Sequence, residues 1–217
     1  MSSSPTPVRV SAQDRRQQIL SEATELFARQ GFEGTTTREI AERVGVNEAI
    51  LFRHFPSKEE LYWSVIDNQC NLRGGIERWR ELLSRPGDES AVLTGLAEDL
   101  LRRNVTFTRL TLFTALENHR LSQRLFRTHV AQYYEILAEY LRERMEAGKF
   151  RKCDPLLAAR CFLGMLVYHF QIQELYGAKR YQHFEVADVA RTFVDIWLRG
   201  IQSAATARSH CEPQELR

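Results

Sequence analysis

Side chains that cap helices recur between residues 35 and 61, in the segment TTTREIAERVGVNEAILFRHFPSKEEL. Thr36 precedes Glu39 by three residues, and Ser57 precedes Glu60 by the same spacing, so each pair predicts a capping box at the start of a helix. The backbone N–H groups at such a start can bind anions, phosphate oxygens among them. The chemistry predicted for this segment is therefore anion binding.

The same segment predicts two short helices with a glycine turn between them. Apolar side chains at helical spacing indicate the first helix over 37–44, and Gly45 ends it. Asn47 is a favoured N-cap and begins the second helix, over 48–54. Both helices are too short to be stable alone, so they must pack on the helix predicted over 11–30. This order predicts a helix-turn-helix, which presents its second helix to the major groove of DNA.

Side chains one turn apart share a face of the second helix. Leu51 and Phe55 are predicted to point inward. The opposite face is formed by four residues: Glu48, Ala49, Phe52 and Arg53. Lys58 follows in the first turn of the next helix, where its charge suits a phosphate oxygen.

The segment closely resembles the DNA-binding domain of the TetR family of transcriptional repressors. The resemblance extends from about Arg16 to Val65 and includes QILSEATELFARQGFEGTTTREIA and HFPSKEEL. It implies an all-α homodimer with three DNA-binding helices in each subunit and a C-terminal domain that binds a small molecule. We therefore expect a repressor that binds a palindromic operator in double-stranded DNA and is released by a small apolar or aromatic effector.

Matched by position, the resemblance implies which residues contact DNA. Contacts to phosphates are expected from Thr36, Thr37, His54 and Lys58. Contacts to bases are expected from Glu48, Ala49, Ile50 and Arg53. The expected DNA-binding set also includes Arg38, Asn47 and Phe52.

Two of these positions are unusual. The family usually has Tyr where this chain has Phe52, which lacks the hydroxyl that reaches a phosphate. Phe52 is expected to pack on a thymine methyl group or to fill the interface. Glu48 is repelled by phosphates unless it accepts a hydrogen bond from a cytosine amino group, so we expect it to influence sequence specificity.

The polar residues of the segment also have purely structural interpretations, which the sequence leaves open. Three of them would serve only as helix caps: Thr36, Asn47 and Ser57. Arg38 and Arg53 would be solvated surface charges, and His54 would form a structural hydrogen bond at the end of its helix.

Helical periodicity continues through the rest of the chain, and the predicted fold class is all-α. Further helices are expected over 57–84, 89–104, 106–117, 121–147, 154–176 and 185–202. Gly74 and Gly75 predict a bend in the first of these. The expected domains are a disordered arm (1–10), the helix-turn-helix domain (11–56), a ligand-binding and dimerisation domain (57–202) and a flexible tail (203–217).

Aromatic side chains are frequent between residues 107 and 184 and predict an apolar cavity with a few polar groups. The expected ligand contacts are Phe107, Phe113, Glu117, Phe126, His129, Tyr133, Met165, Tyr168 and His169. The last two helices are expected to form the dimer interface through Ala158, Phe162, Leu166, Phe170, Phe193 and Trp197. For any single residue of the interface, packing inside the chain's own core is at least as good an interpretation, and for an apolar or aromatic residue of the ligand set it is the more common role.

Composition narrows the function classes. The 217 residues are 43% hydrophobic, enough to form a core, and the net charge of +2 is too small to indicate nucleic-acid binding by itself. No long uncharged apolar run or signal-like N-terminus is present, so we expect a cytoplasmic protein without a membrane partner. The four cysteines are scattered and predict neither a disulfide framework nor a metal site: Cys70, Cys153, Cys161 and Cys211.

Catalytic motifs are missing from the sequence, so we expect neither an enzyme nor a bound cofactor. Two alternatives stay open beside the ligand-released repressor. One is a helical interaction protein, and the other is a regulator that responds to thiol oxidation through Cys153 or Cys161 instead of a small-molecule inducer. The sequence also does not distinguish a repressor from an activator.

Overall fold

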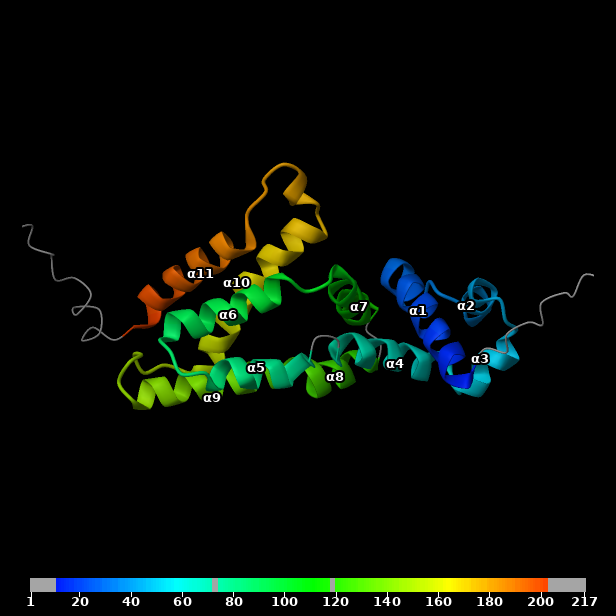
Figure 1. The fold of residues 1–217 in the computed structure, drawn as a ribbon, viewed down its shortest axis with the longest axis horizontal. Coiled ribbons are helices and arrows are strands. Elements are labelled where there is room, and N and C mark those ends of the chain that lie inside the picture. Colours follow the sequence, from blue (N-terminus) through cyan, green and yellow to red (C-terminus); the bar gives the residue numbers. More distant parts are fainter. Residues whose placement is uncertain (1–10, 72–73, 118–119, 203–217) are drawn as a thin grey trace, which may run out of the picture. The chain divides into compact units, whose positions relative to one another are not determined.

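The computed structural model describes residues 11–71, 74–117 and 120–202, and within these ranges the regular structure is helical apart from one isolated bridge between Phe150 and Gln202. The helices, labelled in Figure 1, are α1 (Ala12–Gln30), α2 (Thr37–Val44), α3 (Glu48–His54), α4 (Lys58–Asn71), α5 (Gly75–Ser84), α6 (Glu89–Leu101), α7 (Val105–Leu116), α8 (Leu121–Leu125), the π-helix η2 (Phe126–Val130), α9 (Ala131–Glu146), α10 (Pro155–Glu174), the 3-10 helix η3 (Ala178–Arg180) and α11 (Val186–Ile201). The predicted all-α class is confirmed. The expected arm and tail lie outside the described residues.

The chain divides into two compact units. Unit 1 contains the chain up to Cys70 together with Thr106–Ser122, and unit 2 contains Asn71–Val105 and the chain from Gln123 onward. This division differs from the boundary expected at residue 57, because α4 and α7 group with the three N-terminal helices. The reason lies in packing: Tyr62 of α4 is fully buried, and its ring meets the Phe27 ring of α1 edge-on at 4.8 Å between centroids.

Two of the predicted long helices are interrupted. The helix expected over 57–84 is the pair α4 and α5; Gly74, the N-cap of α5, and Gly75, its first residue, have φ angles of 81° and 48°. Residues with a side chain rarely adopt such positive φ angles, so the two glycines permit the break between α4 and α5. The helix expected over 121–147 consists of α8, η2 and α9.

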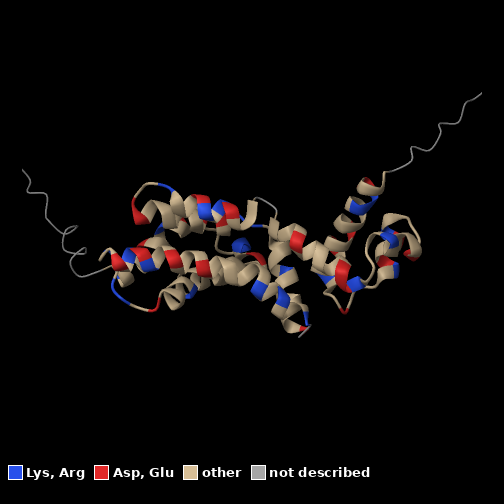
Figure 2. Ribbon diagram, turned by 90° about the horizontal axis from the view of Figure 1, so that it is seen from below, with Lys and Arg blue, Asp and Glu red and all other residues tan. Residues whose placement is uncertain are grey.

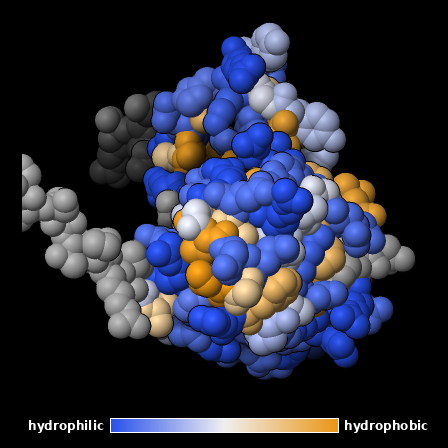
Figure 3. Space-filling view, turned by 90° about the vertical axis from the view of Figure 1, so that its right-hand side faces the viewer, coloured by the Kyte–Doolittle hydropathy of each residue, from blue (hydrophilic) through white to orange (hydrophobic). Residues whose placement is uncertain are grey.

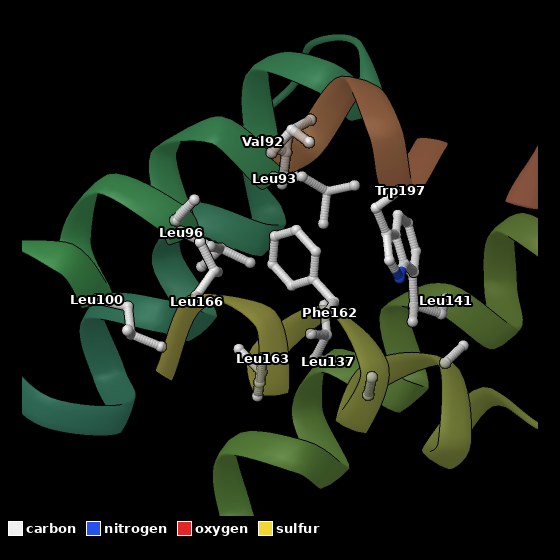
Figure 4. Close-up of a cluster of buried hydrophobic side chains, with 14 of the residues drawn as sticks. Val92, Leu93, Leu96, Leu100, Leu137, Leu141, Phe162, Leu163, Leu166 and Trp197 are labelled. Carbon is white, nitrogen blue, oxygen red and sulfur yellow. The ribbon is translucent and has the colours of Figure 1, made fainter. Parts of the chain in front are cut away.

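The core of unit 2 is built from α5, α6, α9, α10 and α11. Phe162 of α10 is fully buried among Leu93 and Leu96 of α6, Leu137 of α9 and Trp197 of α11 (Figure 4). Its ring packs on the Trp197 indole with centroids 5.3 Å apart. Burial of such large apolar side chains is the main stabilising contribution in a helical domain.

Burial changes the interpretation of the residues expected at a dimer interface. Phe193 is half-buried. The other five are buried within unit 2: Ala158, Phe162, Leu166, Phe170 and Trp197. Phe162 and Leu166 have no exposed surface in the single chain, so they pack in its own core. The side of α10 and α11 that faces solvent carries other apolar residues, among them Leu157 and Ile196.

Helix α10 is also the one described helix long and apolar enough to cross a membrane, judged by length and composition alone. Its apolar character has a different origin here. One side of α10 packs in the core of unit 2, and the opposite side exposes further apolar residues to solvent.

Candidate nucleic-acid interface

Helices α2 and α3 are joined by the caps predicted from the sequence. The Thr36 hydroxyl accepts a hydrogen bond from the Glu39 amide at 3.1 Å and begins α2. Gly45 ends α2 in the left-handed conformation, with φ 74° and ψ 37°. The Asn47 side chain then accepts from the Ile50 amide at 2.9 Å and begins α3. Each cap satisfies backbone groups that a helix end leaves unpaired, so the turn between the helices is fixed.

The inward faces of these helices are buried as predicted. Leu51 of α3 and Phe55 after it have exposed fractions of 0% and 2%. The buried residues of α1 and α2 on which the unit depends include Ile19, Ala23, Leu26, Phe27, Ile40 and Ala41. Because short helices are unstable alone, this packing is what holds α3 in place.

The outward face of α3 is open to solvent. Ala49 and Arg53 are exposed, Phe52 is 41% exposed, and Glu48 and Ile50 are half-buried. Figure 3 shows the side that bears α2 and α3 in Figure 1, and most of that surface is hydrophilic. The residues predicted to contact bases therefore share a surface that a ligand as large as DNA can reach.

Charge on this unit is mixed. Residues 1–60 contain eight Lys or Arg and nine Asp or Glu, and Figure 2 shows the two kinds interspersed along the helices. Arg38 forms an exposed ion pair with Glu42 at 2.8 Å, and the hydrogen bond and charge of Glu42, with a smaller contribution from Glu48, raise the pKa of Arg38. DNA binding here must depend on the placement of individual groups rather than on net charge.

Glu48 is tied to the start of α2. Its carboxylate accepts a hydrogen bond from the Thr37 hydroxyl at 2.6 Å. Glu48 also lies in the first turn of α3, where the helix dipole favours a negative charge. The two residues that were expected at DNA therefore contact each other, and the unusual carboxylate is oriented before any DNA binds.

Lys58 lies over an aromatic ring that the sequence interpretation did not single out. Its Nζ is 4.3 Å from the centroid of the Phe32 ring. Phe32 in turn packs edge-on against Tyr62, with centroids 5.2 Å apart, and is 5% exposed. An ammonium over a ring face is attracted to it and keeps its remaining N–H groups available for other acceptors. The sequence signal for Phe32 is its position directly after Gly31, which ends α1.

The nine expected ligand contacts do not fall in a single described cavity. Three lie in unit 1: Phe107, Phe113 and Glu117. Six lie in unit 2: Phe126, His129, Tyr133, Met165, Tyr168 and His169. Glu117 accepts a hydrogen bond from the Phe32 amide at 3.0 Å, so its carboxylate is engaged with the turn after α1.

Two hollows in unit 2 include expected ligand contacts. His169 lines a cavity of about 120 Å³ near the end of α10, and burial lowers the pKa of this imidazole. Met165 lines a groove of about 420 Å³ between α10 and α11, together with Cys153 and Cys161. Tyr133 packs against the Trp79 ring, and Tyr168 is 65% exposed.

Comparison with known proteins identifies two family models along the chain, one N-terminal and one C-terminal. Residues 19–65 match the family model described as bacterial regulatory proteins, tetR family, and residues 94–200 match the model described as AefR-like transcriptional repressor, C-terminal domain. The chain is 28% identical over 183 residues to the HTH-type transcriptional repressor AcnR of Corynebacterium efficiens, which covers 82% of this chain and 92% of the relative.

Solved structures share the fold. A TetR-family transcriptional regulator from Mesorhizobium loti aligns with a TM-score of 0.70 and 23% identity, over 88% of this chain and 98% of that one. The regulator FadR of Bacillus subtilis, solved in complex with stearoyl-CoA, aligns with a TM-score of 0.67 and 19% identity, over 86% of this chain and 99% of that one.

Proposed function

Because this chain belongs to the TetR family of transcriptional regulators, we propose that it is a cytoplasmic repressor that binds a palindromic operator as a homodimer and is released by a small apolar or aromatic ligand. The observation that carries the proposal is the capped pair α2 and α3, which buries Leu51 and leaves Ala49 and Arg53 exposed on the opposite face. A helix held in this way can enter a major groove.

The outer face of α10 and α11 supports the proposal that the chain forms a homodimer. Apolar or small side chains on this face are exposed at helical spacing: Leu157, Cys161, Gly164 and Tyr168 on α10, and Ile196 and Gly200 on α11. Leu157, Tyr168 and Ile196 are 63%, 65% and 59% exposed. Exposed apolar surface of this kind marks an interface, and a two-fold dimer covers the same patch on both copies. We propose these exposed residues for the interface in preference to the mostly buried residues expected from the sequence.

Homodimerisation implies the form of the operator. Two α3 helices related by a two-fold axis enter successive major grooves about 34–36 Å apart, so the operator is an inverted repeat. Nuclease footprinting should show protection of two symmetric half-sites, and sedimentation should show a dimer at micromolar concentration. A folded monomer that protects one asymmetric half-site would contradict the proposal.

Release by an apolar ligand is supported by the FadR neighbour, whose structure contains stearoyl-CoA. Within unit 2 of this chain, His169 and Met165 are the proposed ligand contacts that line hollows. We expect a ligand of this class to weaken operator binding by about 5–150-fold, corresponding to a coupling of about 1–3 kcal/mol. The test is a thermal-shift screen of fatty acids and acyl-CoA esters, followed by operator affinity at saturation. A ligand that stabilises the protein and leaves the affinity unchanged would refute this release, because equal affinity for both states shifts nothing.

A thiol-responsive regulator is the second candidate, supported by the groove between α10 and α11. Cys153 and Cys161 are both exposed and both line it. Cys161 lies in the second turn of α10, and Cys153 precedes the N-cap of that helix, Asp154. Oxidation would therefore act on the proposed dimer face. Peroxide should then release DNA from the unaltered protein and not from Cys161→Ser, with Cys70→Ser as the control.

A further inference from the structure

The carboxylate of Glu117 joins the end of α7 to the turn that follows α1. Its Oε2 accepts a hydrogen bond from the Phe32 amide at 3.0 Å, across 85 residues of sequence. Phe32 lies between α1 and α2, so the contact fixes the backbone that leads into the helix-turn-helix. A hydrogen bond to an ionised acceptor is stronger than one between neutral groups.

Gly31 makes room for this carboxylate. A Cβ placed on Gly31 would lie 2.1 Å from Glu117 Oε1 and 2.8 Å from Cδ1 of the Phe113 ring. Gly31 also has a φ of 77°, an angle that residues with a side chain rarely adopt. Glu117 and Phe113 therefore pack directly against the glycine backbone, as only glycine permits.

A second contact joins α7 to α4. The Tyr62 hydroxyl lies 2.7 Å from the Thr114 hydroxyl and donates to the Leu110 carbonyl at 3.2 Å. Burial, together with the negative charge of Glu117, raises the pKa of Tyr62 to about 12, so this hydroxyl stays protonated at neutral pH. Helix α7 and the residue that follows it are thus held to the rest of unit 1 at two points, one on α4 and one on the α1–α2 turn.

The contact at Phe32 leads to Lys58. The Phe32 ring stacks on the Phe27 ring and meets the Tyr62 ring edge-on. The Lys58 ammonium lies over the Phe32 ring, 4.3 Å from its centroid. Because the ring is 5% exposed, its position depends on the backbone that carries it. A shift of the Phe32 backbone would therefore move the aromatic ring that the Lys58 ammonium contacts.

We propose that Glu117 is a positioning residue for DNA binding: by holding the Phe32 amide, it sets the α1–α2 turn and places the Lys58 ammonium for a phosphate contact. This inference rests on the proposed DNA-binding function. It gives Glu117 a role in place of the ligand contact expected from the sequence.

The experiment measures operator affinity against salt concentration for Glu117→Ala and Glu117→Gln. Glutamine keeps an oxygen that can accept from the Phe32 amide, and alanine does not. Glu98→Ala is the control, because it removes a partly buried carboxylate that pairs with Arg102 in unit 2. We expect Glu117→Ala to weaken binding about tenfold and Glu117→Gln to restore most of the loss, with Glu98→Ala unchanged.

The salt dependence separates positioning from loss of folded protein. If Lys58 loses its phosphate contact in Glu117→Ala, the slope of log affinity against log salt falls by about one unit. A smaller folded fraction would lower the affinity and leave the slope unchanged. The double variant Glu117→Ala with Lys58→Ala should then lose no more slope than Lys58→Ala alone, because both changes remove the same contact.

Hydrogen exchange at the Phe32 amide gives a readout that needs no DNA, and it should be faster in Glu117→Ala than in Glu98→Ala. An unaltered slope in Glu117→Ala, or additive losses in the double variant, would overturn the inference and leave the proposed function intact. Absence of DNA binding by the unaltered protein would overturn both.

Discussion

Helices α3 and α10 use apolar residues in opposite ways. In α3 the inner residue Leu51 is fully buried, and the outer residues Ala49 and Arg53 face solvent beside a partly exposed Phe52. In α10 the apolar residues continue around the helix, so the core side and the solvent side have similar chemistry. When a helix has one apolar face, the sequence shows which face packs in the core. When a helix has two apolar faces, one packs in the core and the other needs a second surface to cover it.

The two sides of α10 and α11 also differ in what surrounds them. Phe162 is fully buried and contacts residues of the core, whereas Leu157 on the same helix is 63% exposed and lines a groove. Ile196 on α11 lines the same groove. Stability of the subunit should therefore depend on one side and association of two subunits on the other.

The largest effect is expected at the core side. Phe162→Ala should lower the free energy of unfolding by about 3–5 kcal/mol, because it leaves a cavity that the surrounding helices fill only in part. Urea unfolding measures the change. Tyr168→Ala, which removes an exposed ring of similar size from the same helix, is the matched control. Equal losses in the two variants at low protein concentration would remove the distinction between the two sides.

The outer side is tested by a charge. Ile196→Glu should weaken the proposed dimer by about 2–4 kcal/mol, because the interface would bury a carboxylate without a partner. Sedimentation equilibrium gives the dissociation constant, and Gln182→Glu in the exposed loop before α11 introduces the same charge elsewhere. A dimer that tolerates glutamate at residue 196 would place the interface on another surface.

On α3 the exposed face is tested by a change in specificity. Arg53→Ala should cost about 1–3 kcal/mol of operator binding and relax the preference at one base pair if the guanidinium contacts a guanine. A panel of singly substituted operators measures this. Arg142→Ala, an exposed arginine of α9 that pairs with Glu139, should leave the affinity unchanged. Weaker binding that is uniform across all operators would instead make Arg53 a phosphate contact.

The smallest effect compares equivalent caps in the two units. Asn47→Ala and Asp154→Ala each remove the N-cap of a helix and should each reduce stability by about 1 kcal/mol. Only Asn47→Ala should also weaken operator binding, since Asn47 begins α3 and Asp154 begins α10. Unfolding and gel-shift titrations are run on both variants. Asn47→Ser keeps a neutral cap and serves as the control, and operator binding that weakened equally in both alanine variants would contradict the comparison.

The sequence predicted much of unit 1 because its signals are local. Thr36, Gly45, Asn47 and Ser57 all cap or end helices as expected, and each does so through backbone groups within five residues. The break at Gly74 was likewise expected as a bend. Spacing along the chain is sufficient for such features because both partners belong to the same helical turn.

The sequence did not predict which apolar residues of unit 2 are buried in the core and which are exposed. Phe162 and Leu166 were expected at a dimer interface and are core, while Leu157 and Ile196 were not singled out and are exposed. An apolar residue on a helix satisfies the same periodicity in either position. Burial separates the two, and burial depends on how several distant helices pack together.

By itself, therefore, the sequence determined the all-α class and the capped helix-turn-helix with its inner and outer faces, since these follow from hydrogen bonds and side-chain spacing within a few residues. Only the tertiary structure decided that α7 belongs to unit 1 and that the Glu117 carboxylate meets the Phe32 amide. Those two groups are 85 residues apart, and no local spacing relates them. Their contact exists because packing of buried side chains brings the two segments together, and the pattern along the chain does not specify which segments will meet.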